Sequence, residues 1–454
     1  MPHSSIVHDL RSAHSADALL TGVPLPTLLY FALPIILGNI FQQLYSIVDA
    51  IVVGNFLGDL PLSGISVASP IVDVANALVI GGTIGVGVLC AHYCGAGEGE
   101  RLRCMNATAL LGGGALTLLI ALCGIFFSTP LLRAQGTEEA VCREAAVYLQ
   151  LVFAGLLFCF LYNYYAAMLR SCGNSRTPFL ILLLSSTLHA LLDVLFVGVF
   201  GWGIRGVAFS TVLCQALAAA ACILYAQRRC PPLLLRPANL RFDRQMARLV
   251  LSYAWAAALQ QAVVCIGRLL VQGMLTPLGT STVTGYNMSL RTEQFLFCFS
   301  QGISAAMVVC LSQNLGHGDR PRARRFFRIS VLVELALIAL LGTVCFLFPA
   351  RIVGLFSDNA DVIAAGAQYT GAMAYLYVFA YLGEVIQGFF RGLGRLRLTM
   401  VASLLQVLLR VVLSYLLIPV WGMYGICAAV VSGWVLLVGI EGAYAVRKSS
   451  VLAA

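Results

Sequence analysis

The chain has 454 residues, of which 60% are hydrophobic and 10% are charged, with a formal net charge of +9. Soluble domains carry roughly 25% charged residues, so this composition excludes an ordinary soluble protein and indicates a polytopic membrane protein. Nucleic-acid binding is also excluded, because the cations lie in short loops and form no separate basic surface.

Twelve apolar segments are long enough to cross a bilayer as helices, since about 20 residues span the hydrocarbon core. We therefore expect an all-α membrane protein with twelve transmembrane helices. They are predicted to begin near residues 25, 63, 105, 142, 178, 204, 247, 283, 326, 362, 397 and 422. Residues 1–24 contain no apolar core, which predicts a short cytoplasmic tail rather than a cleaved signal peptide.

Arginines accumulate in every second loop, and this asymmetry predicts the orientation. The basic loops hold Arg101, Arg103, Arg170, Arg176 and the arginines of 228–248, 320–328 and 391–397. The opposite loops hold Arg133, Arg143, Arg205 and Arg351. Because positively charged loops stay in the cytoplasm, both termini are predicted to be cytoplasmic in a multi-pass protein of the cell (plasma or inner) membrane.

The two halves of the chain repeat each other. Six residue pairs recur at the offset of 221 that separates Arg170 from Arg391. The other pairs are Gly64 and Gly285, Gly81 and Gly302, Gly95 and Gly316, Gly97 and Gly318, and Gly173 and Gly394. Because each copy has an even number of helices, both insert in the same orientation, which makes a parallel repeat. The predicted domains are a cytoplasmic tail (1–24), a first lobe with helices 1–6 (25–227), a cytoplasmic linker (228–246), a second lobe with helices 7–12 (247–446) and a tail (447–454).

Polar side chains form a stripe on the first predicted helix. Its members are Asn39, Gln42, Gln43, Ser46 and Asp49. A charge near the bilayer centre costs at least about 2.5–3.5 kcal/mol, so Asp49 indicates a functional site. The alternative is a hydrogen-bonded aspartate that only joins helices. On the fifth helix Ser185, His189 and Asp193 share one face, which is expected to meet the stripe in a polar pocket.

Four loop motifs carry a family resemblance. They are GAGEGERLR at 95–103, its copy GHGDRPRARR at 316–325, MLRSCGNSRTP at 168–178 and FFRGLGRLRLT at 389–399. With the first-helix pattern, they resemble the multidrug and toxic compound extrusion (MATE) family over about residues 28–446. The resemblance implies two six-helix lobes and secondary active antiport that exports amphipathic or cationic organic compounds by alternating access, in exchange for protons or sodium.

The resemblance also implies a cation site in the first lobe. The family places an acidic residue on helix 1 with a tyrosine one turn before it, here Asp49 and Tyr45. The family has an Asn-x-x-x-Asp pattern on helix 5, and the matching residues here are His189 and Asp193. The family also has a hydroxyl residue on helix 6, which corresponds to Thr211 here. An imidazole nitrogen suits protons better than hard cations, so we favour H⁺ as the coupling ion. Na⁺ at Asp49, Asp193 and Thr211 is the alternative, and His189 as a purely structural partner of Asp193 also stays open.

Pro34 precedes Asp49 on the same predicted helix. Proline frees a backbone carbonyl and permits a kink. In the MATE family bending at such a proline has been linked to protonation of the aspartate, so the resemblance implies a hinge at Pro34. A kink that only eases packing is the alternative.

The second lobe lacks the matching carboxylates. Gly267 stands near the position of Asp49, and Ala262 and Ala380 stand where some family members carry acidic residues, so coupling is expected in the first lobe. Glu293, beside Arg291, is expected to form an interfacial ion pair. Arg268 and Arg410 are costly charges inside helices, and Glu384 or Glu334 are their candidate partners.

Candidate substrate-cavity residues are Gln42, Gln43, Met168, Tyr377, Tyr381 and Glu384. The predicted partners are small amphipathic or cationic drug-like molecules and the lipid bilayer, and the chain is expected to act as a monomer. A lipid-linked precursor flippase is the alternative function, followed by a channel or receptor. Neither an enzyme nor a cofactor is expected, because no nucleophile–base or metal constellation is visible.

The 15 cysteines are scattered through apolar segments. Cys90 and Cys94 are one helical turn apart, but no second Cys or His pair accompanies them. They are therefore predicted to be small buried hydrophobic residues, and no metal site is predicted at them.

Overall fold

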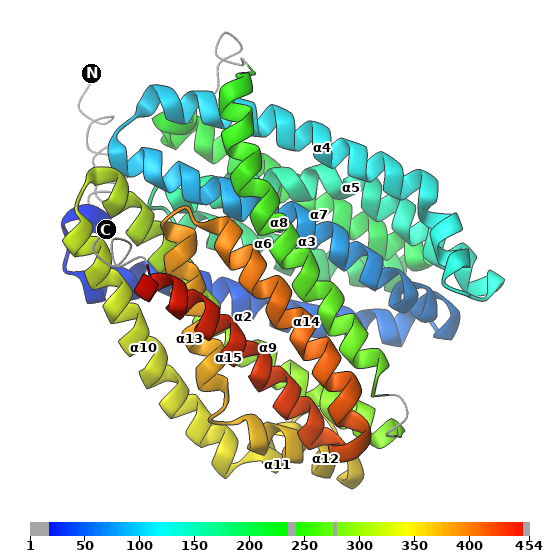
Figure 1. The fold of residues 1–454 in the computed structure, drawn as a ribbon. Helices are drawn as coiled ribbons and strands as arrows, with labels where there is room; N and C mark the ends of the chain where they lie inside the picture. Colours follow the sequence, from blue (N-terminus) through cyan, green and yellow to red (C-terminus); the bar gives the residue numbers. More distant parts are fainter. Residues whose placement is uncertain (1–17, 235–241, 276–278, 448–454) are drawn as a thin grey trace. The chain divides into compact units, whose positions relative to one another are not determined.

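A computed structural model describes residues 18–234, 242–275 and 279–447, which form helices and no strands (Figure 1). The helices of the first half are α2 (Pro24–Phe56), α3 (Asp59–Ala96), α4 (Gly99–Ala134), α5 (Glu139–Ser171), α6 (Arg176–Asp193), the π-helix η1 (Val194–Val199), α7 (Gly203–Arg229) and the 3₁₀-helix η2 (Pro231–Leu233). Those of the second half are α8 (Arg244–Gly273), α9 (Thr280–His317), α10 (Arg320–Leu347), α11 (Pro349–Gly354), α12 (Ala360–Met373), α13 (Tyr377–Gly392), α14 (Leu396–Trp421) and α15 (Met423–Arg447).

The prediction of twelve transmembrane helices is confirmed. Eleven described helices are long and apolar enough to cross a membrane, and α12 and α13 together supply a twelfth, bent span. The bend between these two helices is 57°. Large apolar side chains such as Phe126 and Phe127 on α4 are exposed, as expected of a surface that faces lipid.

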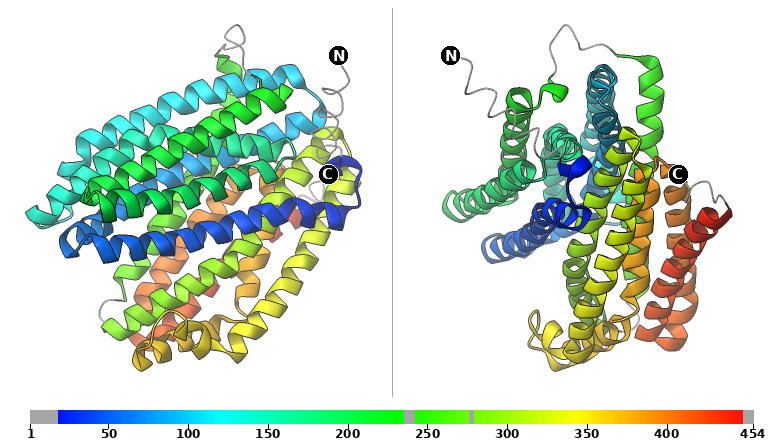
Figure 2. Two further views of the ribbon diagram at one scale, coloured as in Figure 1. Left: turned by 180° about the vertical axis from the view of Figure 1, so that it is seen from behind. Right: turned by 90° about the vertical axis from the view of Figure 1, so that its left-hand side faces the viewer.

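Contacts divide the chain into two compact units. One unit contains Leu37–Ala262, and the other contains Gly22–Ile36 together with the described residues from Val263 onward. The boundary between the units falls inside α2 and inside α8. The lobe boundaries predicted from the sequence lie in loops instead, and they stay a prediction. Within the first unit, α3, α4, α5 and α7 lie side by side (Figure 2).

Two repeat-related glycines allow close helix packing. A Cβ atom on Gly81 of α3 would lie 2.6 Å from the backbone oxygen of Ala257 on α8. In the other unit, a Cβ atom on Gly302 of α9 would lie 2.3 Å from the side chain of Ile36 on α2. Small residues let membrane helices approach each other closely. Each glycine thus packs against the first long helix of the opposite half of the sequence.

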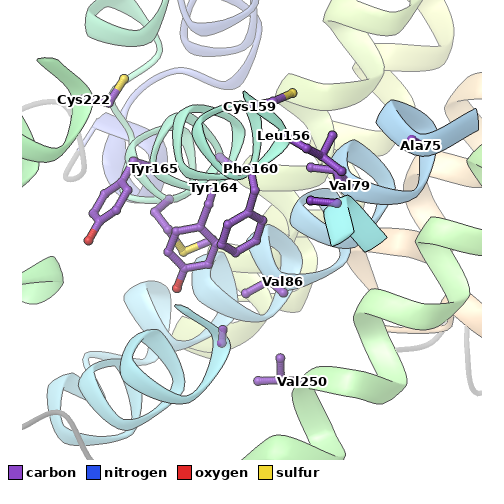
Figure 3. Packing of buried hydrophobic residues seen from close by; sticks show 14 of the residues in the cluster. Ala75, Val79, Val86, Leu156, Cys159, Phe160, Tyr164, Tyr165, Cys222 and Val250 are labelled. Carbon is purple, nitrogen blue, oxygen red and sulfur yellow. The ribbon is translucent and has the colours of Figure 1, made fainter. Parts of the chain in front are cut away.

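The core of the first unit contains polar side chains as well as apolar ones. Phe160 and Tyr164 of α5 point into it beside Val79 and Val86 of α3 (Figure 3). The Tyr164 hydroxyl donates to Oδ1 of Asn106 over 2.7 Å, and the Asn106 amide donates to the Leu233 carbonyl over 3.1 Å. These bonds satisfy two polar groups that are expensive to bury alone.

Candidate functional site

The helix that carries His189 and Asp193 changes its geometry at the site. The α-helix α6 ends at Asp193, and the π-helix η1 begins at Val194. π-helical segments are rare, and they are frequent at functional sites. Left-handed Gly201 and Gly203 then connect η1 to α7, where an ordinary side chain would be strained.

His189 and Asp193 form a buried pair. Their side chains are 6% and 0% exposed, and Nδ1 of His189 lies 3.0 Å from Oδ2 of Asp193. The other carboxylate oxygen, Oδ1, accepts a hydrogen bond from the hydroxyl of Ser210 on α7. Oδ2 makes no hydrogen bond to any other described group. Among the described residues, Oδ2 of Asp193 therefore has the His189 ring as its polar neighbour.

Tyr45 of α2 and Thr211 of α7 complete the cluster around the imidazole ring. The Tyr45 hydroxyl is hydrogen-bonded to Nδ1 of His189, and the two rings meet edge to face with centroids 5.0 Å apart. On the other side of the ring, Nε2 lies 2.9 Å from Oγ1 of Thr211. Tyr45, His189, Asp193 and Thr211 were all selected from the sequence, and the structure brings them together from three helices.

The hydrogen atoms of this cluster can be counted. Thr211 has one hydroxyl hydrogen, and its oxygen lies 2.8 Å from the Val207 carbonyl oxygen and 2.9 Å from Nε2 of His189. If Thr211 donates to Val207, Nε2 carries the imidazole hydrogen, and Nδ1 can accept the hydroxyl hydrogen of Tyr45. If Thr211 donates to Nε2, the imidazole hydrogen itself lies on Nδ1. A proton therefore lies between Nδ1 and Oδ2 in the second arrangement, and also when a further proton makes the ring an imidazolium.

The other residues that the sequence analysis selected on α2 differ in burial. Pro34 is buried, Gln43 is half-buried and Gln42 is exposed, while α2 continues through Pro34 as one helix. The side chain of Asp49 lies outside the part of the chain that the structure describes. Its place in the cation site therefore stays a prediction.

Ser210 was not selected from the sequence. It precedes Thr211 on α7 and is fully buried, and it supplies the hydroxyl that bonds to Asp193. The sequence signal for Ser210 is that it forms, with Thr211, a pair of adjacent hydroxyl residues in an apolar helix. Sequence alone could not choose between them, because adjacent residues on a helix point in different directions.

Glu293 was expected to form an ion pair at the membrane interface, but in the structure it is buried and bonded to tyrosines. Glu293 is 8% exposed, and its Oε2 accepts hydrogen bonds from the hydroxyls of Tyr369 and Tyr377 at 3.3 and 3.2 Å. Arg410 donates to the hydroxyl of Tyr286 over 3.5 Å. Burial removes both charges from water, so tyrosine hydroxyls replace the solvent as their partners.

A second set of carboxylates lies among α10, α13 and α15. Glu384 lies 3.4 Å from Arg391, which differs from the expectation that it pairs with Arg268 or Arg410. Glu334 and Glu441 are both 0% exposed, and their carboxylate oxygens have no hydrogen-bond partner among the described residues. Glu441 was not selected from the sequence, because its burial depends on neighbours from other helices.

Three proposed cavity residues are buried inside a unit. Met168 is fully buried in the core of the first unit. Tyr377 and Tyr381 are each 1% exposed, and Tyr381 donates to the Leu296 carbonyl over 2.7 Å. Their contact with a substrate therefore stays a prediction that requires a change of packing.

Three cysteines come together at the ends of α3 and α5. The sulfur atoms of Cys90, Cys94 and Cys172 all lie within 4.8 Å of one another. The sequence indicated only the first two, which are one turn apart on α3. Cys172 was missed because it is distant in the chain and reaches the pair through the packing of α5 against α3.

Comparisons with known proteins agree with this architecture. The MatE family model matches residues 34–195 and again residues 256–416. The probable multidrug resistance protein YpnP of Bacillus subtilis is 27% identical over 387 residues, which are 85% of this chain and 86% of that protein. The probable multidrug resistance protein NorM of Thermotoga maritima is 23% identical over 388 residues, 84% of this chain and 82% of that protein.

A solved structure has the same fold. It is the outward-facing conformation of a multidrug resistance MATE family transporter of the MOP superfamily, with a TM-score of 0.86, 18% identity, and coverage of 96% of this chain and 98% of that one. The two family matches are almost equal in length and follow the internal repeat. Since these matches cover more than half of the residues, the chain belongs to the multidrug and toxic compound extrusion (MATE) family of membrane transporters.

Proposed function

We propose that this protein exports amphipathic or cationic organic compounds in exchange for protons, by alternating access of its two lobes. The coupling site is the cluster of Tyr45, His189, Asp193 and Thr211 in the first lobe, together with Asp49 of α2. Both termini lie in the cytoplasm, as the arginine asymmetry of the loops indicates. The substrate class is supported by family membership and by the relatives YpnP and NorM, which are named as probable multidrug resistance proteins.

The observation that carries this proposal is the 3.0 Å approach of Nδ1 of His189 to Oδ2 of Asp193 in a buried site. Loss of the proton between these atoms leaves a carboxylate facing the lone pair of an imidazole. Repulsion and the absence of water then disfavour this packing. A proton that binds one conformation better than the other shifts their populations, and this differential affinity is what couples it to transport.

The donor atoms around the pair favour a proton over sodium. Hard cations in proteins are bound by several oxygen ligands. Here an imidazole ring occupies the centre of the cluster, between the oxygens of Tyr45, Asp193 and Thr211. A sodium ion on Oδ2 of Asp193 would have Nδ1 of His189 as its neighbour, and this nitrogen is a poorer ligand than the amide oxygen of the family pattern.

Pro34 is the proposed hinge of α2. It has no backbone N–H, so the turn before it lacks one helical hydrogen bond. Shortly after it, between Ile36 and Leu37, the contacts of α2 change from one compact unit to the other. A helix that contributes to two units needs a compliant point close to this boundary when the units move.

The experiment is transport in proteoliposomes with proton and sodium gradients imposed separately. A fluorescent organic cation should accumulate against its own gradient when a proton gradient is present at constant sodium. Accumulation that requires sodium at constant pH would overturn the proton assignment. Movement only down the substrate gradient would indicate a channel, and transport of lipid-linked pyrophosphate sugars alone would indicate a flippase.

A further inference from the structure

Three thiols from two helices converge in the first unit. Cys90 and Cys94 lie in the last two turns of α3, and Cys172 caps the C-terminus of α5. Their sulfur atoms are within 4.8 Å of one another, and the sulfurs of Cys94 and Cys172 are 3.2 Å apart. Cys90 is fully buried, whereas Cys94 and Cys172 are half-buried. Cys94 and Cys172 are therefore the more exposed members of the group.

The backbone around the thiols is fixed by close packing and by helix caps. The hydroxyl of Ser171 donates to the Gly87 carbonyl over 2.8 Å, which joins α5 to α3 beside the cluster. Left-handed Gly97 and Gly173 end the two helices. These contacts place the thiols before any ligand binds, so little conformational freedom is lost on binding.

We propose that Cys90, Cys94 and Cys172 form a binding site for a thiophilic metal ion, of which Zn²⁺ is the representative. Zinc binds thiolate sulfur at about 2.3 Å, which separates two sulfur ligands by about 3.8 Å in a tetrahedral site. In this group the sulfurs of Cys94 and Cys172 are 3.2 Å apart and all three sulfurs lie within 4.8 Å of one another, which is close to this spacing. Three thiolates leave a fourth position for water.

Soft thiolates select zinc and other thiophilic ions over sodium, magnesium or calcium. The cluster is therefore chemically distinct from the cluster of His189 and Asp193, and its occupancy does not depend on the transport mechanism. The loops after α3 and α5 are on the side that the arginine asymmetry assigns to the cytoplasm, where thiols stay reduced. A bound ion would link the ends of α3 and α5 and stabilise the first lobe there.

The alternative is that the three cysteines act only as small apolar side chains in contact. The two possibilities differ in metal binding and in thiol accessibility. A suitable control is Cys222→Ala, because Cys222 is also fully buried in the first unit but lies outside the group of three. The full-length protein should carry a purification tag without histidine, so that the tag contributes no metal binding.

The test is a zinc titration of the detergent-purified protein against a chromophoric chelator. The wild type and Cys222→Ala should bind one zinc ion per chain at this site. The variant C90A/C94A/C172A should bind zinc at least about 100-fold more weakly. Loss of a group that only hydrogen-bonds to a metal ligand already lowers metal affinity by about 10–100-fold, and this variant loses the ligands themselves. Zinc should also slow maleimide labelling of Cys94 in the wild type and in Cys222→Ala. It should raise the melting temperature of these two proteins but not that of the triple variant.

Equal zinc affinity in the wild type and the triple variant would overturn the proposal. So would labelling of Cys94 that zinc does not change. Size-exclusion profiles and the melting temperature in zinc-free buffer report whether the triple variant is folded. If it is not, the single variant Cys94→Ala alters one half-buried side chain, and it is expected to show the same loss of zinc affinity.

Discussion

The ring nitrogen Nδ1 of His189 lies 3.0 Å from Oδ2 of Asp193, on one face of α6, with both side chains buried. The four-residue spacing makes this approach a local property of the helix. The π-helix begins immediately after Asp193, so the α-helical spacing of side chains does not continue beyond this residue. The pair is thus set by its own helix, while α2 and α7 supply the groups that surround it.

Asp193→Asn should uncouple transport without unfolding the protein. An amide keeps the size of the carboxyl group but cannot take up the proton. Coupling energies of about 1–3 kcal/mol correspond to about 5–150-fold, so proton-driven accumulation of a fluorescent cation should fall at least fivefold. The control is Asp361→Asn at an exposed position on α12. Unchanged accumulation in Asp193→Asn would contradict the role of this residue.

His189→Asn should shift the ion preference toward sodium. The substitution restores the amide of the family pattern and replaces a titratable nitrogen with an oxygen that suits a hard cation. In proteoliposomes, we expect sodium-driven uptake to appear and proton-driven uptake to decrease. His317→Asn, at an exposed position near the end of α9, serves as the matched substitution. A variant that keeps proton coupling and gains no sodium response would argue that His189 is only structural.

Pro34→Ala should slow coupled transport while preserving the fold. Alanine restores the helical hydrogen bond that proline removes, which stiffens α2 close to the point where its contacts change units. We expect a lower transport rate together with an equal or higher melting temperature. Full coupled transport in this variant would favour the alternative that the proline only eases packing.

Gly81→Ala should destabilise the first unit, and the adjacent Gly82→Ala should not. A Cβ atom on Gly81 meets the Ala257 backbone, while a Cβ atom on Gly82 meets nothing within 4 Å. Overpacking of this kind costs about 1–3 kcal/mol. Alanine in an open helical position instead stabilises by about 0.5–1 kcal/mol. Melting temperatures in detergent should therefore move in opposite directions, and equal values would indicate that α3 and α8 are less closely packed.

Tyr377→Phe should destabilise the second unit, because Glu293 would lose one of its two hydroxyl donors. Leaving a buried polar group unsatisfied costs about 1–3 kcal/mol. Tyr375→Phe is the control, since the Tyr375 side chain is half exposed and can exchange its bond to Thr343 for one to water. The expected observation is a lower melting temperature for the first variant only. Similar values for both would mean that the Glu293 carboxyl group is satisfied without Tyr377.

The sequence predicted most of the residues that lie around the His189 ring in the first lobe, for two different reasons. His189 and Asp193 were found because their spacing puts them on one helical face. Tyr45 and Thr211 were found through the family resemblance, and the structure then placed their hydroxyls against the imidazole ring. The prediction for Glu293 was wrong, because a nearby arginine in the sequence does not decide where a carboxylate is buried.

The sequence by itself determined the membrane class, the number of spans and the repeat. These follow from composition, segment length and periodicity, which are properties of residues close together in the chain. Only the tertiary structure decided that Ser210 bonds to Asp193, that Tyr369 and Tyr377 enclose Glu293, and that Cys172 joins Cys90 and Cys94. Such partners come from different helices, and their meeting depends on close packing at glycines such as Gly285 of α9 against α12 and Gly87 of α3 against α5.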